Sequence, residues 1–163
     1  ECHHQPDDTV LRRGQPLLAD LGLKLDHVCA DMTRCVSFGP PTPLWREIYR
    51  IVLTANRTAL RAIRPGVPCH AIDAVARGVI ERAGYGPYFG HSLGHGLGLE
   101  VHEAPSFSSA CTTELAPGMV LTVEPGIYLP GRLGIRIEDV ILVTRDGCEV
   151  LTGTPRDLAW AVR

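Results

Sequence analysis

Five residues of this chain have the types and contexts needed to bind metal ions and support hydrolysis. They are Asp20, Asp31, His95, Glu124 and Glu138, in the contexts Leu-Ala-Asp-Leu-Gly, Ala-Asp-Met-Thr-Arg, Gly-His-Gly-Leu-Gly, Thr-Val-Glu-Pro-Gly-Ile-Tyr and Gly-Ile-Arg-Ile-Glu-Asp. Four carboxylates and one imidazole are costly to bury together, because like charges a few ångström apart cannot all stay ionised. Two divalent cations would balance these charges and supply hydrolytic chemistry. The sequence therefore predicts a dinuclear metal site.

The first two acids each interrupt an apolar segment that has the character of a β-strand. These segments span residues 16–22 and 26–36, and a hairpin turn is expected over residues 22–26. A lone Asp in a strand is usually a turn or edge residue. Two of them in apolar strands, eleven residues apart, make that interpretation poor. We expect neighbouring antiparallel strands to set Asp20 and Asp31 side by side.

Residues 84–105 are dense in glycine and histidine, which is typical of close backbone approach at a ligand site. A single histidine on an apolar background is more often structural than a ligand. Here His91, His95 and His102 fall within twelve residues and are followed by two acids on strands. His95 is the best ligand candidate, since a glycine on either side lets backbone and metal approach closely. His91 and His102 remain available to act on a substrate near neutral pH.

The other segments have the character of scaffold. Apolar residues at helical spacing predict helices over residues 43–63 and about 70–83. Segments rich in Val and Ile predict strands over residues 119–124 and 134–144, joined by a loop with two Pro-Gly pairs, and a short strand over residues 147–151.

Composition excludes several classes of protein. The chain has 163 residues, about one domain, and a net charge of −2 without blocks of like charge, so we expect neither nucleic acid nor a membrane as partner. No apolar run is long enough for a membrane helix. The six cysteines lack Cys-x-x-Cys spacing and predict reduced thiols in a cytoplasmic protein.

The motifs around the five candidate ligands resemble those of the pita-bread metallopeptidases, the family of methionine aminopeptidase, aminopeptidase P and prolidase. That family has Asp-x-Gly, then Ser/Ala-Asp-x-Thr-Arg eleven residues later, Gly-His-Gly-x-Gly, Glu-Pro-Gly-x-Tyr and Arg-x-Glu-Asp. All five ligand positions here hold the expected residue type. The resemblance covers essentially residues 1–163 and implies an α+β pita-bread (creatinase/aminopeptidase) fold.

The resemblance also implies a division of the ligands between two metal ions. Asp20 would bind one ion, His95 and Glu124 would bind the other, and Asp31 and Glu138 would bridge both. A site so rich in carboxylates favours Mn²⁺, with Co²⁺ or Zn²⁺ as alternatives. Glu124 would in addition carry a proton to the leaving amine.

Three histidines resemble family residues that act on the substrate. His102 corresponds to one that stabilises the tetrahedral oxyanion, and His91 to one that contacts the scissile bond. His3 lies seventeen residues before Asp20, where the Xaa-Pro enzymes carry another active-site histidine, and this spacing favours it over His4.

Two features favour the Xaa-Pro branch over methionine aminopeptidase. His91 lies four residues before His95, and Arg136 lies two residues before Glu138, where the methionine enzymes usually have a neutral residue. The guanidinium fork of Arg136 is suited to binding a substrate carboxylate with two hydrogen bonds.

The expected activity is dinuclear-metal hydrolysis of the peptide bond that precedes proline, as in Xaa-Pro dipeptidase (prolidase). The substrate would be a di- or oligopeptide containing proline, and the enzyme a homodimer. The alternatives are an aminopeptidase P that acts on longer Xaa-Pro peptides and a catalytically silent pita-bread binding module. The silent module is disfavoured because its relatives lose metal ligands, and this chain keeps all five. Creatinase-like activity on the same fold does not need the full carboxylate set, so the intact set argues against that activity.

The resemblance also bears on domain organisation. Catalytic domains of this family begin well before the position that corresponds to Glu1. We therefore expect residues 1–163 to be the C-terminal part of a catalytic domain, truncated at its N-terminal side, and an upstream segment of the same protein to be required for function.

Overall fold

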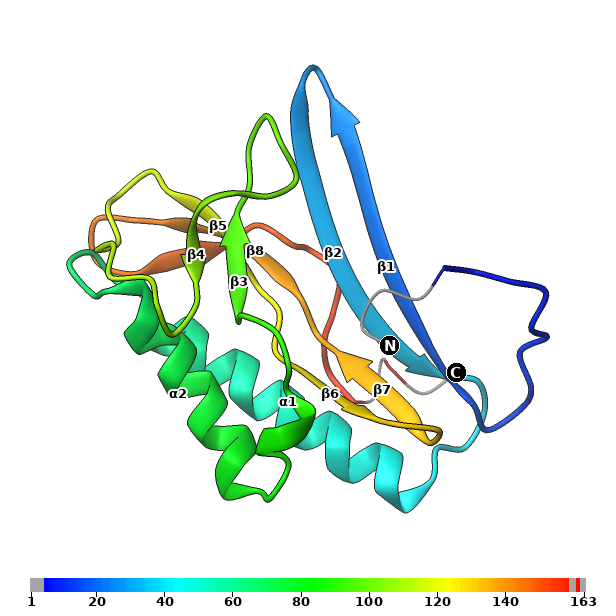
Figure 1. Cartoon of the computed structure of the whole chain (residues 1–163). Helices are drawn as coiled ribbons and strands as arrows, with labels where there is room; N and C mark the ends of the chain where they lie inside the picture. Colours follow the sequence, from blue (N-terminus) through cyan, green and yellow to red (C-terminus); the bar gives the residue numbers. More distant parts are fainter. Residues whose placement is uncertain (1–4, 159–160, 162–163) are drawn as a thin grey trace.

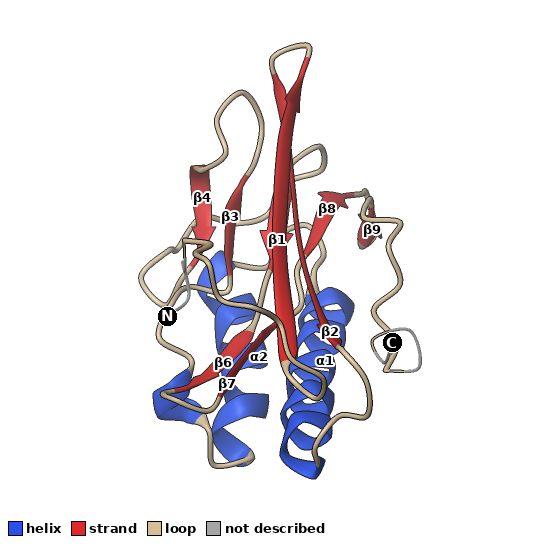
Figure 2. Ribbon diagram, turned by 90° about the vertical axis from the view of Figure 1, so that its right-hand side faces the viewer, coloured by secondary structure: helices blue, strands red, loops and turns tan. Residues whose placement is uncertain are grey.

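Two helices cover one side of a β-layer, and a long two-stranded hairpin lies against the other side (Figures 1 and 2). The structure is a computed structural model that describes residues 5–158 and residue 161. Its helical elements are α1 (Pro43–Ala62), α2 (Cys69–Arg82) and the 3-10 turn η1 (Gly86–Tyr88). Its strands are β1 (Pro16–Leu25), β2 (Val28–Ser37), β3 (Gly94–Gly96), β4 (Glu103–Phe107), β5 (Val120–Val123), β6 (Gly126–Leu129), β7 (Leu133–Arg136), β8 (Asp139–Val143) and β9 (Cys148–Val150). This arrangement confirms the predicted α+β class.

The strands form three antiparallel sheets. The largest has the order β4-β3-β5-β8-β9, and the other two are the pairs β1-β2 and β6-β7. The single strand predicted over residues 134–144 is wrong, because β7 pairs with β6 while β8 pairs with β5 and β9. Ile137 and Glu138 leave both ladders and donate their backbone N–H groups to Pro125 O and Thr33 O. Strand β6 occupies part of the predicted loop.

Both predicted helices form, with bounds within one residue of the expected ones. Helix α1 begins after Thr42, whose side chain accepts a hydrogen bond from Trp45 N at 3.1 Å, as expected for an N-cap. Helix α2 ends beside Gly84, whose φ of +84° suits the residue after a C-cap. Their buried faces pack on the β-layer in one hydrophobic core. Neither of these helices is long and apolar enough to cross a membrane.

The hairpin turn lies two to three residues beyond its expected place. Its central residues are Asp26 and His27, with φ of +47° and +70°, the signs of a type I′ turn. The turn predicted over residues 22–26 is therefore wrong, because Gly22 pairs with Asp31 inside the ladder. The two-residue turn matches the right-handed twist of the strands and lets β1 continue to Leu25.

The register of this hairpin sets both acids on one face. Asp20 lies opposite Thr33, and Gly22 lies opposite Asp31. Directly opposed residues share a face, so the two carboxylates project on the same side, offset diagonally by two positions rather than side by side. That side faces β7 and β8, which contact the hairpin.

Strand β3 passes unusually close to β5. A Cβ atom placed on Gly94 would lie 2.0 Å from the backbone oxygen of Thr122. The two strands approach closely only because this position lacks a side chain. The approach brings His95, the next residue, toward the end of β5.

We therefore expect Gly94→Ala to reduce the free energy of unfolding by at least ~1–3 kcal/mol, the usual cost of overpacking. Denaturant unfolding followed by circular dichroism measures this. Gly153→Ala is the matched control, because a Cβ atom there has no neighbour within 4 Å. Equal stability of the two variants would contradict the close approach.

Candidate metal centre

Three predicted ligands from separate strand segments form a tight group. Asp31 comes from β2, His95 from β3 and Glu138 from the junction of β7 and β8. One potential ligand atom from each lies within 4.8 Å of the others. Glu138 is buried, and the side chains of Asp31 and His95 are each 12% exposed. The group is thus a set of oxygen and nitrogen donors in a partly buried place.

The other two predicted ligands lie beside this group. Glu124 follows β5, and its Oε1 is 3.3 Å from Nε2 of His95. Asp20 stands at the rim, 41% exposed, with Oδ2 at 2.5 Å from a terminal nitrogen of Arg136. Its charge still acts on Asp31. The structure therefore brings four predicted ligands together and holds the fifth next to them in an ion pair.

The imidazole of His95 is oriented for metal binding. Its Nδ1 lies 3.1 Å from Gly96 O, and because a carbonyl only accepts, Nδ1 must carry the proton. The lone pair is then on Nε2, which faces Glu124 and Asp31. This is the tautomer used by metal-binding histidines whose other nitrogen donates to a carbonyl.

The structure describes two of the three histidines expected to act on substrate. The ring of the exposed His102 lies 4.2 Å from that of His95, centroid to centroid. His91 donates from Nδ1 to Ser92 O at 2.8 Å, so its Nε2 accepts from the Tyr128 hydroxyl at 3.0 Å. His3 lies outside the described residues.

Arg136 is buried in contact with several of these groups. It donates to the Tyr128 hydroxyl at 2.9 Å, to Thr33 Oγ1 at 3.0 Å and to Asp20. Its Nε is also 3.9 Å from Glu124 Oε2. A substrate carboxylate would have to exchange with these partners, so the predicted carboxylate-binding role stays a prediction. In this structure, its charge offsets those of the surrounding acids.

Sequence reasoning assigned no role to three residues that hold the acids in place. Thr33 Oγ1 donates to Glu138 Oε2 at 2.6 Å. Thr122 Oγ1 accepts from His95 N at 3.0 Å and donates to Glu124 Oε1 at 3.3 Å. Tyr128 joins His91 to Arg136. Thr33 lies two residues after Asp31, and Tyr128 lies four residues after Glu124. Both are part of the quoted motifs, which therefore contained the signal for these supporting residues.

A buried ion pair lies behind the acids. Arg34 donates to Asp139 Oδ1 at 2.7 Å and to the backbone oxygen of Glu138. The other oxygen of Asp139 accepts from Asn56 and from Arg156, both at 3.0 Å. Asp139 is completely buried, so these donors supply the partners that a buried carboxylate requires. The pair joins β2 to β8, close to where these segments carry Asp31 and Glu138.

The acids of the metal-free site have perturbed pKa values. Burial, with the charge of Glu138, raises the pKa of Glu124 to about 8. Burial, with the charge of Asp31, raises the pKa of Glu138 to about 7. Burial also raises the pKa of Asp31, and it lowers that of His95. Without a cation, Glu124 and Glu138 therefore retain protons near neutral pH, as expected of ligands that release them when metal binds.

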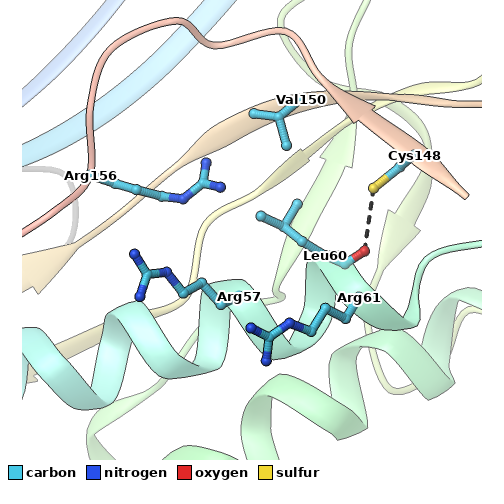
Figure 3. A pocket seen from close by; sticks show the side chains of 6 residues that line it. All are labelled: Arg57, Leu60, Arg61, Cys148, Val150 and Arg156. Atoms are coloured by element: carbon cyan, nitrogen blue, oxygen red, sulfur yellow. Dashed lines mark hydrogen bonds between the residues drawn. The ribbon is translucent and has the colours of Figure 1, made fainter.

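The hollow shown in Figure 3 is a separate feature on the outer side of α1. Its lining residues are Arg57, Leu60, Arg61, Cys148, Val150 and Arg156, and none is a predicted site residue. Arg57 is paired with Asp157 at 2.7 Å, and Arg156 with Asp139 at 3.0 Å. The metal centre is thus defined by the convergence of donor atoms and not by this pocket.

The chain belongs to metallopeptidase family M24, whose family model matches residues 1–145. An uncharacterized peptidase of Staphylococcus aureus strain USA300 is 52% identical over 150 residues, which cover 92% of this chain and 43% of the relative. A relative from Staphylococcus saprophyticus is 53% identical over 151 residues. The chain thus spans less than half the length of these relatives.

Solved structures of Xaa-Pro peptidases have the same fold. An X-Pro aminopeptidase from Thermotoga maritima superposes with a TM-score of 0.93 at 46% identity, covering 95% of this chain and 44% of that one. Prolidase from Pyrococcus furiosus superposes with a TM-score of 0.90 at 46% identity, covering 91% and 44%. These matches confirm the predicted pita-bread fold and the likeness to the Xaa-Pro branch.

The pKa values predict that the metal-free protein loses stability as the pH rises. Both glutamates have an ordinary pKa of 4.5 and folded-state values near 8 and 7. Between these limits the folded protein holds more protons than the unfolded chain, so the free energy of unfolding falls with rising pH. We expect the melting temperature in EDTA to fall by roughly 5–10 °C between pH 5 and pH 8.5.

Thermal unfolding in EDTA and in Mn²⁺ provides the comparison. The stabilisation by Mn²⁺ should grow with pH, because metal displaces protons. Glu124→Gln should make the EDTA profile less steep, since an amide does not titrate in this range whereas Glu138 still does. A melting temperature in EDTA that is constant or rises over this interval would contradict the assignment.

Proposed function

We propose that this chain carries the metal ligands and proton-transfer groups of a peptidase that hydrolyses the peptide bond preceding proline, as a Xaa-Pro dipeptidase. The observation that supports this most directly is the convergence of Asp31, His95, Glu124 and Glu138, in a chain of the M24 family that resembles prolidases. The chain spans 43–44% of the relatives it matches, so the proposal concerns the site that these residues build.

The donor set fits two divalent ions. One atom each of Asp31, His95 and Glu138 lies within the shared 4.8 Å, and Glu124 is next to His95. Asp31 and Glu138 would serve both ions, His95 and Glu124 would hold one of them, and Asp20 would hold the other after leaving its contact with Arg136. Mostly oxygen donors favour Mn²⁺ over softer ions. Bound divalent ions would polarise the peptide carbonyl and acidify a water molecule.

The remaining chemistry falls to the chain's own side chains. Glu124, whose Oε1 lies beside His95 and accepts from Thr122, is assigned to take up a proton and pass it to the leaving amine. His102, exposed and next to His95, can donate a hydrogen bond to the developing oxyanion. His91, held by Tyr128, is assigned to the scissile-bond region. His3 is retained as a predicted catalytic residue and Arg136 as a predicted substrate-binding residue.

The alternative is an aminopeptidase P that accepts longer peptides. The similarity to the Thermotoga X-Pro aminopeptidase supports an aminopeptidase P as strongly as the similarity to prolidases supports a dipeptidase. Comparison of Xaa-Pro dipeptides with Xaa-Pro-Xaa tripeptides as substrates distinguishes the two. A silent binding module would cleave neither.

We expect the protein to bind two Mn²⁺ ions per chain and to cleave Xaa-Pro peptides only when they are bound. Isothermal titration of EDTA-treated protein gives the stoichiometry, and release of free proline from the dipeptide gives the activity. A maximum of one ion per chain would contradict the dinuclear site. Two bound ions without cleavage of either peptide would support the binding module instead.

We expect His102→Ala to lower kcat by about 10²–10³-fold, the usual loss for one oxyanion donor, with Mn²⁺ affinity nearly unchanged. Glu124→Gln should lower both kcat and Mn²⁺ affinity, because it removes a ligand and a proton carrier together. His70→Ala, on α2 and outside the site, is the control for loss of an imidazole. Unchanged kcat with loss of metal in His102→Ala would make His102 a ligand.

A further inference from the structure

Two cysteines meet where helix α2 begins, away from the metal ligands. Cys69 is the first residue of α2, and Cys111 lies in the loop that follows β4. Their backbones are joined by hydrogen bonds from Cys69 N to Thr113 O and from His70 N to Cys111 O, both 2.9 Å. The two thiols are near enough to affect one another's pKa. The backbone hydrogen bonds thus hold the segments of the two cysteines side by side although the cysteines are 42 residues apart in the chain.

The two thiols have different surroundings. Cys69 is completely buried, and burial raises its pKa to about 12. Cys111 is partly exposed. Burial alone would raise the pKa of Cys111, but hydrogen bonds from Thr113, from the backbone of Ser106 and from Cys69 outweigh it and lower that pKa. Cys111 is therefore the thiol that ionises and meets solvent, and Cys69 is its sheltered neighbour.

The other described cysteines differ from this pair. Cys29, Cys35 and Cys148 hydrogen-bond through their sulfur atoms to backbone carbonyl oxygens. Cys148 is partly exposed, as Cys111 is, yet burial raises the pKa of its thiol. Cys148 therefore offers an internal comparison for a thiol of similar access and lower thiolate content.

We propose that Cys111 and Cys69 form an oxidisable pair, in which Cys111 reacts with a hydroperoxide and Cys69 converts the product to a disulfide. The Cys111 thiolate would attack the peroxide, the O–O bond would break, and an alcohol or water would leave after taking a proton from solvent. Cys69 would then attack the Cys111 sulfenic acid, with loss of water that carries the Cys69 proton. The two thiols lose two electrons and two protons, and the peroxide is reduced.

The disulfide would convert a hydrogen-bonded contact into a covalent link. It would join the first turn of α2 to the loop after β4, whose Ser106 pairs with His95 across the β3–β4 ladder. Restraint of the intervening residues in the unfolded chain should raise the melting temperature of the oxidised protein. The proposal does not depend on the peptidase activity.

The test uses reduced protein in EDTA, treated with one equivalent of hydrogen peroxide and mapped by mass spectrometry. The expected product is a peptide pair linked through Cys69 and Cys111, lighter by two hydrogens than the reduced pair. In Cys69→Ala, dimedone should trap a sulfenic acid on Cys111. Iodoacetamide should label Cys111 faster than Cys148, since a lowered pKa increases the thiolate fraction of Cys111 and a raised pKa decreases that of Cys148.

Cys148→Ser is the matched control and should form the same disulfide as the unaltered protein. The labelling rates require no variant, so they hold even if Cys69→Ala folds poorly. The proposal is overturned if Cys111 labels no faster than Cys148. It is equally overturned if peroxide carries Cys111 to the sulfinic acid without the linked peptide, or links Cys111 to a cysteine other than Cys69.

Discussion

The constraint on which this structure depends is the repulsion among carboxylates gathered into one partly buried place. Asp31, Glu124 and Glu138 come from three separate segments, and none is fully solvated. In the absence of a cation, the fold reduces that repulsion by proton retention and by the buried guanidinium of Arg136. Thr33 adds a hydroxyl donor to Glu138. These are partial measures, which is why the site is suited to divalent ions.

The same constraint explains residues of the motifs that are not ligands. Glu138 faces the other acids, whereas the next residue, Asp139, is held on Arg34. Arg34 also reaches the backbone oxygen of Glu138, so one guanidinium fixes both the strand that carries Asp31 and the junction that carries Glu138. Backbone hydrogen bonds from Glu124 N to Leu93 O and from Glu138 N to Thr33 O add to this frame. A metal site in this fold is therefore a property of several interlocked segments.

Much of this was predictable from sequence, for reasons that can be stated. The helices were predicted from the helical spacing of their apolar residues, and in the structure suitable residues flank their ends, as at Thr42 and Gly84. His95 was identified because its flanking glycines serve only a close approach, which Gly94 makes against Thr122. The side-chain types of the five candidate ligands also pointed to a single metal-binding chemistry before any geometry was known.

The errors have equally physical causes. The hairpin turn was placed too early because Gly22 is a usual turn residue, while the true turn uses Asp26 and His27 without any glycine. Residues 134–144 looked like one strand because the apolar pattern continues through Ile137, where the chain changes sheets. A change of pairing partner depends on distant segments, here β6 and β5, and has no local sequence signal. In the same way, the ion pair of Asp20 with Arg136 joins distant segments and has no local sequence signal.

The register of the β1–β2 hairpin has a consequence for insertions and deletions. Asp20 lies five ladder positions from the Leu25–Val28 pair that closes the turn, and Asp31 lies three positions from it. A slip of one position between the strands would turn one acid to the opposite face of the hairpin relative to the other. The turn at the distant tip thus fixes the relative positions of two carboxylates that lie several residues away from it. Length changes at this exposed end, where loops are usually most tolerant, should be poorly tolerated whenever they shift the pairing by an odd number.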